Sequence, residues 1–264
     1  MDEWQVAPDD QHAIRERILL YAQAGVGKTY ALLSLATLYM DSNFYILDTD
    51  DRFERIWKER FSFLPNIRYK RVNDWEQIED RIKFLKEMAT KGQLQKHDWV
   101  GVEMLGRWWE MAQFYEVQRV YGADKAQVAL EDRATSRRNK KEPKPGGLET
   151  FDWNIVKELH NPTIGTVLQL PCNIVATTSA DEIISFFDRK DSERMNLFGQ
   201  IGYKPEGEKH NFHLFDTVLF LELMLATKQR FMTSLKDTGR PLLNRVEFGD
   251  NLYLDYIEAV KAEG

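Results

Sequence analysis

Residues 17–39 read RILLYAQAGVGKTYALLSLATLY, and this stretch carries the strongest fold signal in the chain. Its first part, residues 17–22, is a short apolar run typical of a buried strand. Its last part, residues 28–39, has apolar residues at helical spacing. The loop between them holds two glycines, which let the backbone curl so that its N–H groups point inward, and the start of the next helix favours an anion. The stretch therefore predicts a strand, a phosphate-binding loop and a helix.

The loop matches a phosphate-loop pattern of glycine, four residues and then Gly-Lys-Thr, except that Ala22 stands at the first glycine. An alanine held at positive φ would cost on the order of 1 kcal/mol. We expect Lys28 to reach the β- and γ-phosphates of ATP and Thr29 to ligate Mg²⁺. An ordinary strand-to-helix turn is the alternative. The residues expected to bind the nucleotide are Gln23, Ala24, Gly25, Val26, Gly27, Lys28, Thr29 and Tyr30.

Acidic residues follow two further strand-like runs, residues 44–47 and 99–102. We expect Glu103, after the second run, to hold Mg²⁺, because a phosphate loop needs a carboxylate there. Asp48 and Asp50 follow the first run at i and i+2, so in an extended segment their side chains point the same way. At the carboxyl edge of a parallel sheet Asp48 would lie near the metal and Asp50 near the attacking water. A surface glutamate and a solvated turn are the alternatives.

The whole chain alternates strand-like and helical runs, which predicts an α/β domain with a mostly parallel central sheet flanked by helices. Beyond the segments above we expect helices over 74–90 and 153–159, a strand over 173–177, hairpin strands over 213–220 and 227–234, and a final strand and helix within 251–260. With no repeat or linker, residues 1–264 are expected to form a single domain. A basic insertion over about 132–150 interrupts it, and residues 136–147 are expected to be an exposed mobile loop.

Composition excludes several classes of protein. Lys and Arg number 36 against 42 Asp and Glu, and the formal charge of −6 argues against nucleic-acid binding over the whole surface. A lone Cys172 excludes an internal disulfide framework and indicates a reducing compartment. The start lacks a secretory signal, and the longest apolar stretch, residues 215–226, is too short to cross a membrane. We expect a cytoplasmic protein without membrane contact.

Cations gather in one segment, and they are the natural candidates for binding single-stranded DNA, because each neutralised phosphate releases counterions. These cations are Arg133, Arg137, Arg138, Lys140, Lys141 and Lys144. A solvated charged loop is the alternative. At the end of the later strand, Thr178 and Ser179 are candidates to sense the γ-phosphate, and a plain Ser/Thr turn is the alternative there.

With the phosphate loop, ILDTD at 46–50 and IVATTS at 174–179, the chain resembles RecA-type ATPases. More narrowly, it resembles the RecA-like nucleotide-binding proteins of tailed bacteriophages, including the Sak-four group linked to single-strand annealing and recombination. The narrower resemblance rests on WVGVEMLGRWWE at 99–110, FDW at 151–153 and FMTSLKDTGR at 231–240, and it spans about residues 15–256. It implies a RecA-like core and an ATPase that acts on single-stranded DNA.

The resemblance also implies roles for single residues. Asp50 would take the place of the family's catalytic glutamate, one methylene shorter. Thr178 or Ser179 would couple the γ-phosphate to the DNA loops, where the family has Gln or His. Lys236 and Arg240 would reach the ATP of an adjacent subunit, so that a homo-oligomer, ring or filament, completes the active site. Further partners would be a single-strand-binding protein or another replication or recombination protein.

Two other classes stay open. A nucleotide or nucleoside kinase also begins with a strand, a phosphate loop and a helix, and residues 133–144 would then serve as its arginine-bearing lid. A non-hydrolysing, nucleotide-dependent assembly or DNA-packaging factor fits the departures at Ala22, Asp50 and Glu103.

Overall fold

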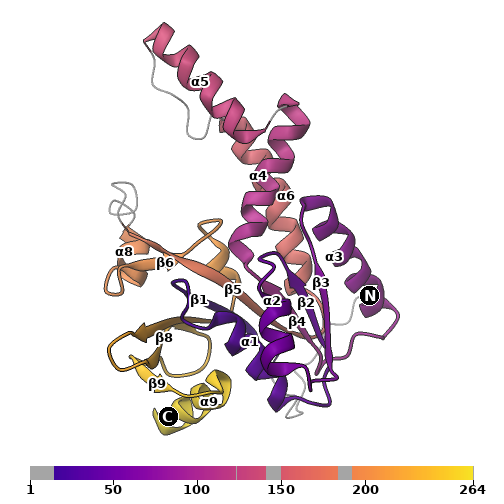
Figure 1. The fold of residues 1–264 in the computed structure, drawn as a ribbon, viewed down its shortest axis with the longest axis vertical. Coiled ribbons are helices and arrows are strands. Elements are labelled where there is room, and N and C mark those ends of the chain that lie inside the picture. Colours follow the sequence, from indigo (N-terminus) through magenta and orange to yellow (C-terminus); the bar gives the residue numbers. More distant parts are fainter. Residues whose placement is uncertain (1–14, 123, 141–149, 184–191, 264) are drawn as a thin grey trace, which may run out of the picture.

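The computed structural model describes residues 15–122, 124–140, 150–183 and 192–263 (Figure 1). Within them, nine strands form one sheet in the order β3-β2-β4-β5-β1-β7-β8-β9, with β6 paired to β5. The strands are β1 (Arg17–Ala22), β2 (Phe44–Asp48), β3 (Ile67–Arg71), β4 (Trp99–Glu103), β5 (Asn173–Glu182), β6 (Tyr203–Pro205), β7 (Thr217–Met224), β8 (Gln229–Asp237) and β9 (Val246–Phe248). The strands from β3 to β7 along this order are parallel, and β6, β8 and β9 pair antiparallel.

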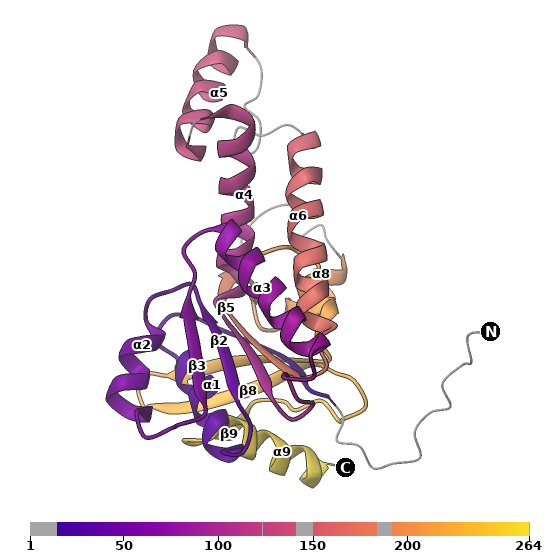
Figure 2. The ribbon, with the colours of Figure 1, turned by 90° about the vertical axis from the view of Figure 1, so that its right-hand side faces the viewer.

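Helices cover both faces of the sheet (Figures 1 and 2). They are α1 (Lys28–Leu38), α2 (Phe53–Ile56) with its π-helical continuation (Trp57–Phe61), α3 (Trp75–Thr90), α4 (Leu105–Tyr121), α5 (Lys125–Asn139), α6 (Thr150–Leu168), α8 (Ser192–Phe198) and α9 (Leu252–Glu263). This arrangement confirms the predicted α/β domain with a mostly parallel central sheet flanked by helices.

The central strand β1 shows how the sequence produces two hydrophobic layers. Ile18, Leu20 and Ala22 belong to the cluster formed with α1 and α9. Leu19 and Tyr21 belong to the cluster formed with α3, α4 and α6. A strand that is buried on both faces reads as a continuous apolar run. The residue after β1 therefore emerges at the edge of a rigid, fully covered sheet.

Helices α4, α5 and α6 form an arm between β4 and β5 that projects from the sheet (Figures 1 and 2). The expectation of a mobile loop over residues 136–147 is wrong for its first part, because Ser136 to Asn139 form the last turn of α5. Asp124 starts this helix by accepting a hydrogen bond from the Gln127 backbone N–H at 2.8 Å, and such a cap stabilises a helix by about 1 kcal/mol. Lys141 and Lys144 lie outside the described residues.

Other expectations also differ from the structure. The strand expected over 173–177 continues to Glu182, so Thr178 and Ser179 lie within β5 and not at its end. The edge strand β3 was not expected. The strand expected from His213 begins at Thr217, after a 3-10 turn over Asn211–Leu214. The final strand is β9, before the expected range, and Asn251 lies just ahead of α9, where its side chain accepts from the Leu254 N–H at 3.3 Å.

The single cysteine lies just before β5. Cys172 is fully buried, and burial raises the pKa of its thiol to about 12. Among the helices that the structure describes, none combines the length and apolar character needed to cross a membrane.

Candidate nucleotide site

The loop between β1 and α1 adopts its curled shape at Gly25 (φ 81°) and Gly27 (φ 110°), where a side chain would be strained. Ala22 is instead a regular strand residue, paired in register with Ser179 of β5 and Leu221 of β7. The energetic penalty considered for alanine at this position is therefore absent. The loop departs from the usual pattern at a place where no glycine is needed.

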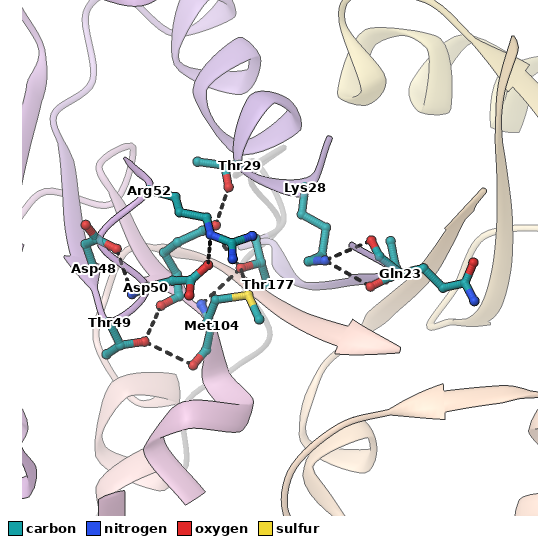
Figure 3. A network of polar contacts seen from close by, with 11 residues as sticks. Gln23, Lys28, Thr29, Asp48, Thr49, Asp50, Arg52, Met104 and Thr177 are labelled. Atoms are coloured by element: carbon teal, nitrogen blue, oxygen red, sulfur yellow. Dashed lines mark hydrogen bonds and ion pairs between the residues drawn. The ribbon is translucent and has the colours of Figure 1, made fainter. Parts of the chain in front are cut away.

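Lys28 turns its ammonium back toward the loop (Figure 3). Its Nζ donates to the carbonyl oxygens of Ala22 at 2.9 Å and Gln23 at 3.2 Å. Burial lowers the pKa of Lys28, and the charges of Glu103 and Asp50 oppose this shift. A desolvated cation held only by neutral carbonyls is well suited to exchange them for a phosphate oxygen.

Glu103, at the end of β4, accepts hydrogen bonds from side chains of two other elements, α1 and β5. Its Oε1 accepts from the Thr29 hydroxyl at 2.5 Å, and its Oε2 accepts from the Thr177 hydroxyl at 2.9 Å. The Thr177 oxygen in turn accepts from the Met104 N–H at 3.1 Å. Thr29 belongs to α1 and Thr177 to β5, so this carboxylate links the phosphate loop to the neighbouring strand.

The chemistry of this pair fits Mg²⁺. Glu103 is 1% exposed, and burial raises its pKa to about 7, while the hydrogen bonds from Thr29 and Thr177 act in the opposite direction. Mg²⁺ prefers oxygen ligands and is usually held by few protein groups together with substrate phosphates. A divalent cation would also favour the ionised carboxylate. Thr29 and Glu103 would hold the ion, directly or through water.

Asp48 and Asp50 separate at the turn after β2. Asp48 is 1% exposed, its Oδ1 accepts from the Asp50 N–H at 3.0 Å, and burial raises its pKa. Asp50 lines the cleft and forms an ion pair with Arg52 at 3.4 Å. The expectation that both side chains point the same way required an extended segment, but β2 ends at Asp48 and the Asp50 N–H turns back onto the Asp48 carboxylate. Asp48 holds the turn, and Asp50 reaches the cleft.

A cleft of about 440 Å³ opens above these groups. Its lining residues are Ala24, Gly25, Gly27, Lys28, Thr29, Asp50, Arg52, Ile56, Glu103, Met104, Arg107, Ser179 and Glu206. Five of the eight predicted loop residues are among them; Gln23, Val26 and Tyr30 are not. Val26 packs into the core and Tyr30 lies against the Arg230 guanidinium. Ser179 lines the cleft, whereas Thr178 lies behind it and holds Gly106 and Glu206 by hydrogen bonds at 3.2 and 3.0 Å.

The sequence matches the AAA domain family over residues 14–245. The chain belongs to the AAA domain family. No curated protein matches it in sequence. Among the 102 matching chains of solved structures is one titled "Crystal structure of the RadB recombinase", with 12% identity, a TM-score of 0.45, and coverage of 89% of this chain and 88% of that one.

Membership of the AAA domain family, together with the loop and the cleft, identifies an ATP-binding P-loop protein. Sequence reasoning missed five residues that line the cleft of this AAA domain: the apolar Ile56 and Met104 and the charged Arg52, Arg107 and Glu206. Arg107 had a detectable signal, because it comes four residues after the strand-terminal Glu103, at the start of the next helix. Glu206 had none, because it comes from the distant segment after β6.

Two predicted cations of the AAA domain, Lys236 and Arg240, do not lie at the cleft of their own subunit. β8 runs antiparallel to β7, so its end at Asp237 pairs with the start of β7 at the opposite edge of the sheet. Lys236 donates to the carbonyl oxygens of His213 and Phe215 there. Arg240 is ion-paired with Glu16, just before β1. A role in an adjacent subunit stays a prediction for both.

The predicted DNA-binding cations of the AAA domain are also remote from the cleft. Arg133, Arg137 and Arg138 are exposed on α5, and Lys140 follows its last turn. They gather at the tip of the arm, away from the sheet (Figure 1). The structure therefore separates them from Lys28 and brings together Lys28, Thr29, Asp50, Glu103 and Ser179.

Proposed function

We propose that this protein is an ATPase of RecA-like type that binds Mg·ATP in the cleft and acts on single-stranded DNA in phage recombination or replication. One observation supports nucleotide binding. Glu103 accepts a hydrogen bond from the hydroxyl of Thr29, which lies in the first turn of α1 after the phosphate loop, and the charge of Glu103 acts on the ammonium of Lys28. A hydroxyl, a carboxylate and a cation in this arrangement suit the metal and phosphates of a nucleoside triphosphate.

Hydrolysis needs a group that orients or deprotonates the attacking water. Asp50 is the candidate, because it lines the cleft and its charge acts on Lys28. Ser179, also on the cleft, would contact the γ-phosphate from the β5 side. In a homo-oligomer, Lys236 and Arg240 would serve the site of the adjacent subunit.

The arm is the part that we propose binds single-stranded DNA. Its tip carries three exposed arginines on one helix, and binding through phosphates would be salt-sensitive and independent of base sequence. Binding at the tip of α5 leaves the cleft accessible. DNA contact and nucleotide binding are therefore separable by mutation.

Phosphate release from Mg·ATP by the purified protein, with and without single-stranded DNA, tests the proposal. Release that rises with DNA and is absent in Lys28→Ala is the expected result. ATP binding without release under both conditions would contradict the ATPase. It would favour a nucleotide-dependent assembly factor, for which the ion pair between Asp50 and Arg52 is the supporting observation.

Charge reversal of Arg137, Arg138, Lys140 and Lys141 to Glu tests the DNA surface. We expect single-strand binding to be lost at moderate salt, with ATP binding intact, because the salt slope falls by about 3 for four phosphate contacts. The control reverses four exposed lysines on and near α3: Lys83, Lys86, Lys91 and Lys96. Equal loss in both variants, or unchanged binding at low salt, would reject the arm as the DNA site.

A further inference from the structure

The arm begins inside the nucleotide cleft. β4 ends at Glu103, Met104 adopts a left-handed conformation (φ 70°), and α4 starts at Leu105. The Gly106 N–H is held by the Thr178 hydroxyl at 3.2 Å, and a side chain at Gly106 would meet that oxygen at 2.9 Å. This close approach fixes the first turn of α4 against Thr178 of β5, and the next residue is Arg107.

Arg107 faces the same carboxylates as the phosphate-loop lysine. Its guanidinium pairs with Glu110 at 2.6 Å, and the charges of Asp50 and Glu206 also act on it, which together raise its pKa. Asp50 and Glu206 act likewise on Lys28. Lys28 and Arg107 therefore lie around one acidic space, and both line the cleft.

The position of Arg107 relative to the metal pair indicates which phosphate it would meet. In P-loop proteins the Mg²⁺ bridges the β- and γ-phosphates. Thr29 and Glu103 mark that place here. Arg107 comes four residues after Glu103, in the first turn of α4, where the neighbouring Gly106 is bonded to Thr178 of β5. A terminal phosphate bound beside this pair would therefore lie in the same cleft as Arg107.

The ion pair that now holds Arg107 is easily exchanged. Its side chain is 51% exposed and its partner Glu110 is 36% exposed, and pairs of this kind contribute little. A guanidinium matches phosphate oxygens with two parallel hydrogen bonds, which are stronger than neutral ones.

We propose that Arg107, supplied by the same subunit, binds the terminal phosphate of ATP and makes the cleft prefer ATP to ADP. The inference rests on the proposed nucleotide binding and adds a phosphate contact to it. Because Arg107 belongs to α4, the same contact ties the presence of the terminal phosphate to the base of the arm.

Calorimetric titration with a non-hydrolysable ATP analogue and with ADP, both with Mg²⁺, tests the proposal. In Arg107→Ala we expect the affinity for the analogue to fall by about 10-fold or more, as for loss of a charged hydrogen bond, and that for ADP to change less than about twofold. Arg107→Lys keeps the positive charge but cannot make two parallel hydrogen bonds, so its affinity for the analogue should lie between those of wild type and Arg107→Ala.

A control arginine lies on the same helix; its carboxylate partner is 2% exposed, so urea unfolding of the control variant is measured alongside its affinities. Arg119 is 53% exposed and pairs with Glu116 at 2.8 Å, three residues away, but lines no part of the cleft. Arg119→Ala should leave both affinities unchanged. Equal weakening of both ligands in Arg107→Ala, or no change in either, would overturn the proposal. Failure of the wild-type protein to bind either nucleotide would instead reject the proposed function.

Discussion

Past the carboxyl ends of β1 and β4, Lys28, Thr29 and Glu103 line a cleft. At the other end of β1, Glu16 and Arg240 belong to a closed cluster. Arg240 in that cluster is bonded to both oxygens of Glu16 and to the Tyr256 hydroxyl. Tyr253 adds a bond to Glu16 at 3.0 Å, and Tyr256 donates to Asp237.

The cleft and the closed cluster contain the same kinds of groups, namely carboxylates, cations and hydroxyls. They differ in how many of these groups remain able to bind a ligand. In the closed cluster Glu16, just before β1, is met by Arg240, which follows β8, and by the Tyr253 hydroxyl of α9. At the cleft Lys28 is held by carbonyls, and Glu103 by two hydroxyls. Complete pairing stabilises the fold, whereas incomplete compensation leaves binding energy for a ligand.

The largest difference is expected from removing one carboxylate charge from the cleft and one from the closed cluster. Glu103→Gln should lower phosphate release by at least about a hundredfold, because the metal loses its anionic ligand, and should keep the protein folded. Glu16→Gln should leave release unchanged and lower stability. Steady-state phosphate release and urea unfolding measure the two effects. If Glu16→Gln also lost phosphate release, the proposed difference between the cleft and the closed cluster would be contradicted.

Next, Arg240→Ala should lower the free energy of unfolding by about 2–3 kcal/mol, because it leaves Glu16 with a largely buried, unpaired charge. Urea unfolding checks this value. ATP affinity of the same variant should not change. If stability were intact and phosphate release fell only in the assembled protein, Arg240 would act on a neighbouring subunit instead of closing its own fold.

A smaller effect follows from the pKa of Glu103, which is about 7 in the folded protein against an ordinary value of 4.5 for a glutamate. The folded state binds the proton more tightly, so the stability that this group contributes is present below pH 4.5 and is lost as the pH rises through 7. In metal-free protein, the unfolding free energy of wild type relative to Glu103→Gln should fall by about 2 kcal/mol between about pH 5 and 8. A constant difference across this range would contradict the assignment.

The smallest effect is expected from Thr177→Val, which keeps the shape of the side chain. It removes the hydrogen bond to Glu103 and leaves the Met104 N–H without its acceptor. We expect a loss of about 1 kcal/mol in the free energy of unfolding. Urea unfolding with and without Mg²⁺ checks it, and an unchanged midpoint would show that Glu103 needs no support from β5.

The sequence predicts the central sheet and the phosphate loop because both depend on local pattern. β1 is buried on both faces and reads as an apolar run, and the two loop glycines lie where positive φ is needed. β3 was missed because an edge strand, IRYKR, carries three cations and only one buried residue. The start of α5 was missed because the high local charge outweighed the capping signal of Asp124 and Gln127.

The site was predicted where it follows a strand directly and missed where it depends on tertiary contacts. Glu103 ends β4, so its place at the carboxyl edge follows from the fold class. The separation of Asp48 from Asp50 depends on a bend that no periodicity encodes. Glu206 reaches the cleft because Thr178 and the Ser179 carbonyl hold its segment against β5.

The burial of Cys172 makes the protein well suited to site-specific labelling. Its thiol is fully buried and protonated at neutral pH, so maleimide reagents, which attack accessible thiolates, will be slow to modify it. A second cysteine introduced at an exposed position of α5, such as Thr135→Cys, would then be the selectively reactive group. A fluorophore placed there can report movement of the arm when nucleotide enters a site at its other end.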